Sequence, residues 1–330
     1  MGNAHQTAAG GVVILRAALA TVVAVCIAQS AEAHGIAGNR FFPGTITFDD
    51  PAVADELQLF TIDARHDLSG TMTPVVRDRA FYGSFQRLLV EDLAVGINSG
   101  GIWRTGGGLS PRAGFDQTSL SLKQQVYRND LQETLVAASL TWGIGGTGSR
   151  AVGASAPNTL APGLTFGQGF GALFDALAWL RPFGIAGAVS LEVPLDHVRS
   201  ARSIAETTAM VGQIGTVSGA NVTTLHWGFS IEYSTLYLSD RFTPGQLPKD
   251  EPLHQLVPLV EFAFDTPWRQ KTAATMNPGL AYVEDVWQLS GEVIVPLNKQ
   301  GGRSLGFRTQ ILIFLDDFAP SIFGKPLLTR

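Results

Sequence analysis

The stretch LHWGFSIEY, residues 225–233, alternates strictly between two kinds of side chain. Trp227, Phe229, Ile231 and Tyr233 are large and apolar, whereas the residues between them are small or polar. Successive side chains of a β-strand point to opposite faces, so this pattern predicts a strand with one apolar and one polar face. In a soluble β-sandwich the apolar face lies in the core, whereas in a membrane barrel it faces lipid and the polar face lines the interior. The alternation therefore restricts the fold to these two classes.

Similar segments recur along the chain, separated by turn residues, and predict about ten strands. They cover residues 57–62, 80–89, 93–104, 118–127, 134–145, 183–195, 224–233, 255–265, 286–297 and 304–315. The connections VED, RNDLQE and NKQGGR are short, whereas 146–182 and 196–222 are expected as long loops. Alternating short and long connections are typical of bacterial outer-membrane barrels. Within the first long loop, FGALFDALAWL (170–180) predicts a short amphipathic helix, either at the mouth of a pore or on the surface.

The first 33 residues have the organisation of a secretory signal peptide. Arg16 precedes an apolar run over 17–28, and Ala-Glu-Ala at 31–33 has the small-x-small form of a cleavage site. The run is short for a bilayer span; a buried N-terminal helix is the alternative. Cys26, the only cysteine, lies in this segment, so a mature chain beginning at His34 would form no disulfide. Export without disulfides is compatible with a bacterial envelope protein.

The composition beyond this segment fits a chain that shows much of its surface to lipid. No later apolar run approaches 18 residues, so no transmembrane helix is predicted. Charged residues make up 15% of the chain, and its net charge of −5 argues against nucleic acid as a partner. Aromatic residues near the segment ends predict interfacial girdles: Tyr82, Trp103, Tyr127, Trp142, Trp268, Tyr282 and Trp287.

The polar faces of the predicted strands carry single charged residues among small ones. We expect six of them to line the lumen: Glu192, Glu232, Glu261, Glu292, Arg308 and Lys123. Such a lining could filter solutes or bind a cation. In the alternative, the carboxylates pair with neighbouring Arg and Lys side chains and plug a narrow barrel. The sequence leaves both possibilities open.

Enzyme and metal signatures are weak. His226 and Ser230 share a strand face but stand about 13 Å apart at the usual strand rise, too far for a Ser–His hydrogen bond. The chain has no Gly-x-Ser-x-Gly and no His-Glu-x-x-His, and RTGGGLSPR lacks the Gly-Lys-Ser/Thr ending of a phosphate loop. His34 could bind copper through its amine and ring, but no partner histidine can be assigned. We therefore predict a protein without enzymatic activity, cofactor or metal.

Residues 276–298, MNPGLAYVEDVWQLSGEVIVPLN, resemble the C-terminal pattern of the outer-membrane proteins grouped as the MetA-pathway-of-phenol-degradation family. The resemblance lies in the Asn-Pro-Gly-Leu start, the Trp-Gln-Leu and the closing Val-Pro-Leu-Asn, and it is sharp only over 276–315. It implies a transporter-like β-barrel with no settled substrate. Many outer-membrane barrels end on a terminal aromatic of the last strand, whereas here DDFAPSIFGKPLLTR follows.

Together these features predict an all-β protein: an antiparallel transmembrane β-barrel of about 10–12 strands with a short N-terminal periplasmic segment. We expect a signal peptide at 1–33, the periplasmic segment at 34–55, the barrel at 56–318 and a C-terminal tail at 319–330. The expected function is passive passage or binding of a small solute in the bacterial outer membrane, whose lipid is the expected partner. The alternatives are a secreted or periplasmic β-sandwich that binds a ligand and, more weakly, an outer-membrane hydrolase.

Overall fold

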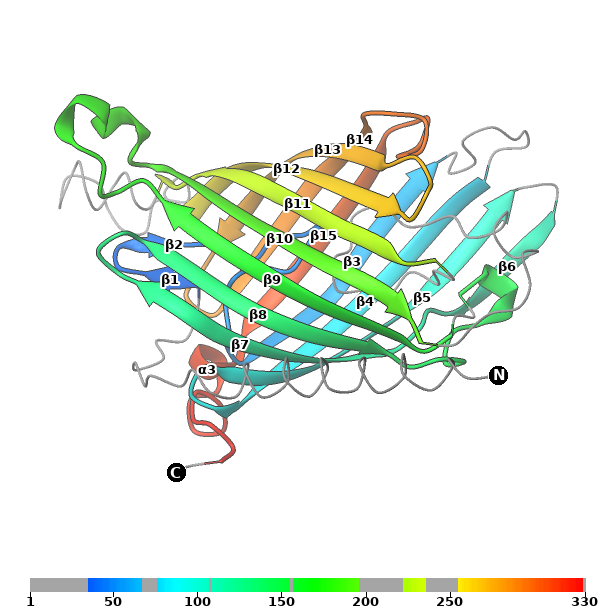
Figure 1. Ribbon diagram of the computed structural model, residues 1–330, viewed down its shortest axis with the longest axis horizontal. Helices are drawn as coiled ribbons and strands as arrows, with labels where there is room; N and C mark the ends of the chain where they lie inside the picture. Colours follow the sequence, from blue (N-terminus) through cyan, green and yellow to red (C-terminus); the bar gives the residue numbers. More distant parts are fainter. Residues whose placement is uncertain are drawn as a thin grey trace, which may run out of the picture. The chain divides into compact units, whose positions relative to one another are not determined.

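The computed structural model describes residues 35–66, 76–106, 109–154, 157–195, 222–235 and 255–328. Twelve antiparallel strands within these residues form a closed ring, which confirms the expected barrel (Figure 1). They are β3 (Glu56–His66), β4 (Val76–Val90), β5 (Leu93–Gly106), β7 (Ser119–Asn129), β8 (Thr134–Gly143), β9 (Thr159–Gly169), β10 (Phe183–Pro194), β11 (Thr224–Tyr233), β12 (Leu256–Pro267), β13 (Ala273–Val283), β14 (Trp287–Pro296) and β15 (Gly306–Phe314). The predicted signal peptide lies outside the described residues.

The ring closes because the last strand pairs with the first. Ile313 of β15 lies opposite Leu57 of β3, and Phe314 lies opposite Glu56. β6 (Leu109–Phe115) is an additional strand that pairs only with residues 101–106 of β5. A closed ring leaves no strand edge with unpaired backbone groups, which is what a β-protein needs in order to span a bilayer.

The strand order gives the barrel two different ends. β3 begins and β15 ends at one of them, here called the termini end, which lies to the left in Figure 1. The connections 91–92, 130–133, 170–182 and 284–286 are also at this end, because neighbouring strands are antiparallel. The opposite end, here called the loop end, has the connections 144–158, 268–272 and 297–305. The short turns VED and RNDLQE therefore lie at the termini end, whereas NKQGGR lies at the loop end.

Three strands depart from the expected pattern. β9 lies inside the segment predicted as one long loop. Its Pro162 and three glycines interrupt the alternation from which a strand is predicted. β13 carries Pro278 in mid-strand, a residue that usually argues against a strand. β6 lies in the stretch between the strands expected at 93–104 and 118–127. The prediction of an amphipathic helix over 170–180 is also wrong, because this range contains only a 3₁₀ helix, η2 (Asp175–Leu180).

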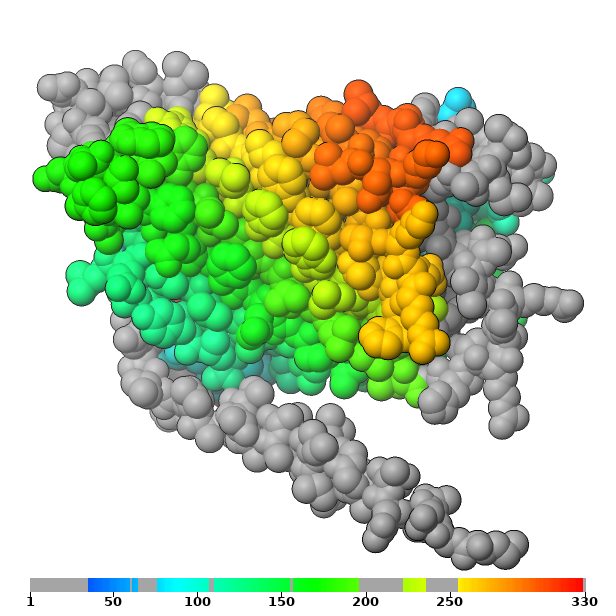
Figure 2. Space-filling view, turned by 45° about the horizontal axis from the view of Figure 1, so that its top comes forward, coloured from blue at the N-terminus to red at the C-terminus, as the bar shows by residue number. Residues whose placement is uncertain are grey.

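The outer face of the barrel is apolar and the inner face is polar. On β11, Ile231 is 42% exposed, whereas its neighbours Ser230 and Glu232 are 0% and 1% exposed. Figure 2 shows the outer side chains of successive strands, from teal through green to orange, forming a continuous surface. This arrangement is the reverse of a soluble sandwich. Trp103 and Trp142 point outward as a girdle requires, but Tyr82 is 1% exposed and packs inward against Val152, so its assignment to the girdle is wrong.

Residues 35–55, here called the inner segment, are packed among the interior side chains. Two short strands, β1 (Ile36–Ala37) and β2 (Arg40–Phe41), pair at its start, and Gly38 in their turn lies against the 130–133 turn. The segment then reaches interior residues of β12 to β15 before β3 begins at Glu56. The sequence predicts 34–55 as a segment on the periplasmic side, whereas residues 35–55 lie among the interior side chains of the barrel. The segment has no sustained period, so neither a strand nor a helix pattern indicates this position.

The chain after β15 turns back onto the barrel at the termini end. It forms the short helix α3 (Leu315–Phe318), and the backbone N–H groups of Leu327 and Leu328 donate to the carbonyls of Leu88 and Leu89 on β4. Arg87 of β4 pairs with Asp55 and stacks on Phe323, which ties the start of the barrel to its tail.

Candidate functional site: the barrel interior

The six charged residues expected in the lumen lie on the inner face of the barrel. Glu192, Glu232, Glu261 and Glu292 are between 0% and 2% exposed, and Arg308 and Lys123 are 0% and 3% exposed. Their neighbours in sequence point outward: Leu191 is 41% exposed and Val293 is 40% exposed. Buried charges need partners, so their contacts decide what each residue does. A role in lining a conduction path stays a prediction.

Thr47 of the inner segment is the centre of a polar cluster. Its Oγ1 donates to Glu292 Oε1 (2.9 Å) and accepts from Asn277 Nδ2 (2.8 Å) and Arg308 Nη1 (2.9 Å). Arg308 also donates through Nη1 to Glu292 Oε1 (3.0 Å) and through Nη2 to Asp63 Oδ2 (2.9 Å). These residues come from four neighbouring strands, β13, β14, β15 and β3, so one hydroxyl of the inner segment joins a large part of the wall.

Glu261 and Gln288 hold the backbone of the inner segment. The two carboxylate oxygens of Glu261 accept the N–H groups of Ile46 (2.9 Å) and Thr47 (2.8 Å). The amide of Gln288 accepts from Gly44 N (3.0 Å) and donates to Gly44 O (2.7 Å). Backbone groups inside a barrel must find such partners, because unpaired buried N–H and C=O groups cost free energy.

Charged side chains connect both ends of the inner segment to the wall and its turns. Lys123 on β7, on a different stretch of the wall, donates to Asp49 (2.8 Å) and lies 3.6 Å from Asp50. Arg40 is 0% exposed and donates to the carbonyls of 181 and 182 at 2.5 Å and 2.8 Å. At the termini end, Asp130 accepts from Gly38 N (3.1 Å), and the Arg128 guanidinium beside it lowers the pKa of this carboxyl.

The aromatic residues of the inner segment pack where the wall has its smallest residues. Phe42 packs with Ala186, and a Cβ on Gly167 would lie 3.0 Å from its ring. Phe48 packs with Ala188, and a Cβ on Gly228 would lie 3.1 Å from its ring. Alanine and glycine on the inner faces of β9 to β11 therefore leave room for these two rings.

Glu192 and Glu232 have side-chain partners on the wall, and among the described residues neither forms a hydrogen bond or ion pair with the inner segment. Glu192 of β10, His226 of β11 and Asp265 of β12 form a row across three strands, with His226 Nδ1 2.6 Å from Asp265 Oδ1 and Nε2 3.5 Å from Glu192 Oε2. Glu232 accepts from Ser230 Oγ (2.7 Å). The histidine and the serine thus bond to different carboxylates, as the strand spacing indicated, and do not form a Ser–His pair.

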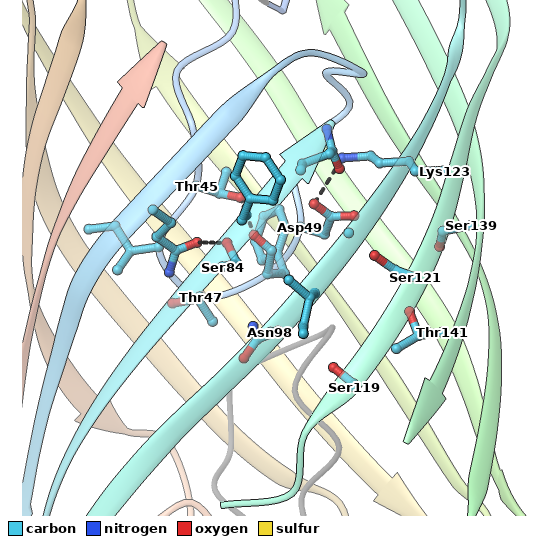
Figure 3. A pocket seen from close by; sticks show the side chains of 17 residues that line it. Thr45, Thr47, Asp49, Ser84, Asn98, Ser119, Ser121, Lys123, Ser139 and Thr141 are labelled. Carbon is cyan, nitrogen blue, oxygen red and sulfur yellow. Dashed lines mark hydrogen bonds and ion pairs between the residues drawn. The ribbon is translucent and has the colours of Figure 1, made fainter. Parts of the chain in front are cut away.

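A cavity of about 120 Å³ lies beside the inner segment, against the wall formed by β3, β4, β5, β7 and β8. Its lining is dominated by short hydroxyl and amide side chains, namely Ser84, Asn98, Ser119, Ser121, Ser139 and Thr141, together with Thr45 and Thr47 of the inner segment. Figure 3 shows these side chains around one space, with the Lys123–Asp49 pair at its edge. This volume holds several water molecules, and the lining offers donors and acceptors without a dominant charge.

The structure thus gathers Glu261, Glu292 and Arg308 in one cluster but places Glu192, Glu232 and Lys123 elsewhere. Glu292 pairs with the cation Arg308, whereas Glu261 accepts backbone N–H groups and Glu192 and Glu232 contact His226 and Ser230. The choice between a charged lining and a plugged barrel therefore stays a prediction. Sequence reasoning missed the hydroxyl wall, although SLSLK (119–123) alternates serine with leucine and carried the signal. It also missed the inner segment, for which only the small residues facing Phe42 and Phe48 were a clue.

No group of three or more His, Cys, Asp or Glu side chains in the described part of the chain is arranged to hold a metal ion. No helix among the described residues has the length and apolarity to cross a bilayer.

The fold and the site define a closed antiparallel barrel with an apolar outside, a polar inside and an occupying N-terminal segment. No protein-family model matches the chain, and no curated protein matches it in sequence. Among solved structures, a KdgM porin is similar at 11% identity and a TM-score of 0.38, covering 77% of this chain and 98% of the porin. The COG4313 outer membrane channel from Pseudomonas putida F1 is similar at 9% identity and a TM-score of 0.46, covering 83% of this chain and 99% of that one.

Proposed function

We propose that this chain is an outer-membrane β-barrel channel, or a transporter-like protein, for passive passage or binding of a small polar solute. The observation that carries the proposal is the division of each strand into an apolar outer face and a polar inner face that borders a cavity. Strands β11 and β14 have 10 residues each, within the range of about 9–11 residues that a tilted strand needs to cross a bilayer.

The orientation follows from the ends of the barrel. Bacterial outer-membrane barrels have short turns on the periplasmic side and longer loops outside. The three shortest connections between barrel strands, 91–92, 130–133 and 284–286, are all at the termini end. We therefore assign the termini end to the periplasm and the loop end to the exterior. A signal peptide at 1–33 is the export route that this location requires.

The solute class follows from the cavity lining. Hydroxyl and amide groups can donate and accept hydrogen bonds with a hydroxylated or otherwise uncharged polar solute. The charged groups nearby already bind one another or the inner segment. A twelve-stranded barrel is wider than an eight-stranded one, whose interior the side chains fill. The inner segment fills part of this extra space and the cavity is what remains. A small solute therefore passes or binds beside the segment.

The proposal also includes a finer assignment, to the MetA-pathway-of-phenol-degradation family. Its support is the resemblance over 276–298, which coincides with the β13–β14 hairpin. The alternatives fit less well: a soluble sandwich would bury the apolar faces, and an outer-membrane hydrolase would need a nucleophile beside a base, which Ser230 and His226 do not provide.

A pair of adjacent positions on β7 tests the proposal. Ser121 faces the cavity and Leu122 is 44% exposed on the outer face. The mature chain in liposomes should let small neutral sugars enter, measured by liposome swelling. Ser121→Trp should reduce the swelling rate severalfold, and Leu122→Trp should leave it unchanged. Equal rates for both variants, or a wild-type rate equal to that of protein-free liposomes, would reject passage through the cavity. A protein that is monomeric and folded in buffer without detergent would reject the membrane location itself.

A further inference from the structure

The exposed charges of the described residues are segregated between the two ends of the barrel. Those at the loop end are all basic: Arg77, Arg79, Arg150, Arg269, Lys271, Lys299 and Arg303. Those at the termini end are acidic except for Lys325: Glu91, Asp130, Asp175, Asp285 and Asp317. The described residues therefore form a basic rim at the loop end, in a chain whose net charge is −5.

Six of the seven basic residues form an arc around the rim. Arg269 and Lys271 lie in the β12–β13 turn, Lys299 and Arg303 lie in the β14–β15 turn, and Arg77 and Arg79 lie at the start of β4. The strands β12, β13, β14, β15, β3 and β4 are consecutive neighbours in the sheet, so the three pairs follow one another along the rim. The first two turns lie at the right-hand end of the barrel in Figure 1.

Each basic pair stands next to a large exposed apolar side chain. Arg79 lies directly opposite Trp103 on β5, which is 57% exposed. Trp268, 67% exposed, precedes Arg269, and Leu305, 63% exposed, follows Arg303 in the next turn. Tryptophan beside a cation is the arrangement found where the hydrocarbon of a bilayer meets its headgroups.

Arg77 and Arg79 have the geometry of an anion-binding pair. Both point outward from β4, two residues apart, so their backbone positions are about 7 Å apart along the strand. Asp78 between them turns inward and pairs with Arg104 at 2.6 Å. Within the described part of the chain, neither Arg77 nor Arg79 has an ion pair. Two guanidinium groups at this spacing suit phosphate oxygens, which arginine binds well.

We propose that this arc binds the phosphate groups of lipids in the leaflet that surrounds the loop end. The inference rests on the membrane location of the proposed function and adds a ligand class, a phosphate-bearing lipid headgroup. The outer girdle places the hydrocarbon boundary just below the arc, and phosphates lie immediately beyond that boundary. Binding there fixes the depth of the barrel in the membrane and its direction.

Lipid retention by the folded protein in detergent tests the proposal. Wild type is compared with the double variants Arg77→Gln/Arg79→Gln and Arg269→Gln/Lys271→Gln, and with Lys325→Gln as a matched exposed cation at the other end. The probe is bisphosphorylated lipid A beside its dephosphorylated form, with bound lipid counted by native mass spectrometry. Each double variant should lose about 25-fold in affinity, at about fivefold for each cation removed. Lys325→Gln should retain wild-type affinity.

Three results would overturn this inference: unchanged affinity in both double variants, equal binding of the dephosphorylated lipid, or displacement of the lipid by an equimolar amount of inorganic phosphate. Heat-modifiable migration on a detergent gel reports separately on the folded barrel. A heat-modifiable protein that is found in the membrane fraction but does not bind lipid phosphate would refute only the proposal that the arc binds phosphate. A protein that is soluble without detergent would refute the membrane location as well.

Discussion

Replacing Glu261 by glutamine should release the inner segment from the wall. The carboxylate accepts two backbone N–H groups, from Ile46 and Thr47. A glutamine of the same shape has one oxygen, so one of these hydrogen bonds is lost and its buried N–H faces an NH₂ group. A hydrogen bond to a charged group contributes about 1.5–3 kcal/mol. Because 1.4 kcal/mol corresponds to a factor of ten, the ratio of released to docked segment should rise about 10- to 150-fold.

A second effect, the relief of charge repulsion, opposes the loss of this hydrogen bond and reduces the expected rise in the ratio of released to docked segment. Glu261 and Glu292 are both buried and repel each other, so neutralising one of them relieves the other. We therefore expect the lower half of the range. Arg308 remains paired with Asp63 and Glu292 in the variant, so the wall itself should stay intact.

Single-channel recording in planar bilayers measures the change. Wild type should show rare large openings, and Glu261→Gln should show them at least ten times as often with the same large conductance. Glu192→Gln is the matched control, because its carboxylate lies beside His226 rather than the inner segment. A cysteine pair at positions 48 and 188, whose side chains pack together, should abolish the openings when oxidised. Opening frequencies that do not differ between Glu261→Gln and wild type would refute the assignment of Glu261 as a clamp.

Three further changes test other parts of the structure. Arg308→Met should destabilise the barrel by about 3–5 kcal/mol, because Asp63 and Glu292 are left buried without their cation; urea unfolding in detergent measures this, and an unchanged midpoint contradicts the pairing. Val293→Lys, on the outer face, should cost about 2–4 kcal/mol in a bilayer if it lies near the midplane, and equal stability in lipid would place this face elsewhere. Gly38→Val should loosen the inner segment, since a Cβ there would lie 2.2 Å from a backbone oxygen of the 130–133 turn, and faster proteolysis of residues 35–55 reports it.

The alternation of side chains predicts the strands and the residues that share each face, whereas the unequal connections, the aromatic residues near the strand ends and the export segment favour a barrel over a sandwich. On β14, Leu289 and Val293 point outward, whereas Ser290 and Glu292 point inward, as their order in the sequence indicates. The period of a strand is short, so a few residues define it. Strands with proline or many glycines, such as β9 and β13, break the pattern without leaving the sheet, because neighbours on both sides hold them in place.

The partners of the charged residues could not be predicted in the same way. Thr47 and Arg308 are far apart in the chain, and neither strand period nor residue type indicates that they meet. Their contact depends on the path of the inner segment, which has no period and is positioned by the wall. The positions of Glu261 and Glu292 were therefore predictable from the sequence, whereas their roles as anchors of a backbone segment were not.

The two sides of the interior wall have different roles, because one side binds the inner segment and the other borders the cavity. Strands β9 to β15 and β3 offer small residues, single charges and amides, which bind the inner segment at Phe42, Phe48 and Thr47. Strands β4, β5, β7 and β8 offer hydroxyl and amide groups and border the cavity. Passage through this cavity does not require the segment to leave, because the cavity lies beside it. Basal passage and large openings are therefore separable. In a Glu261→Gln background, Ser121→Trp should block basal passage through the cavity. The large openings should remain, because a released segment frees space on the opposite wall.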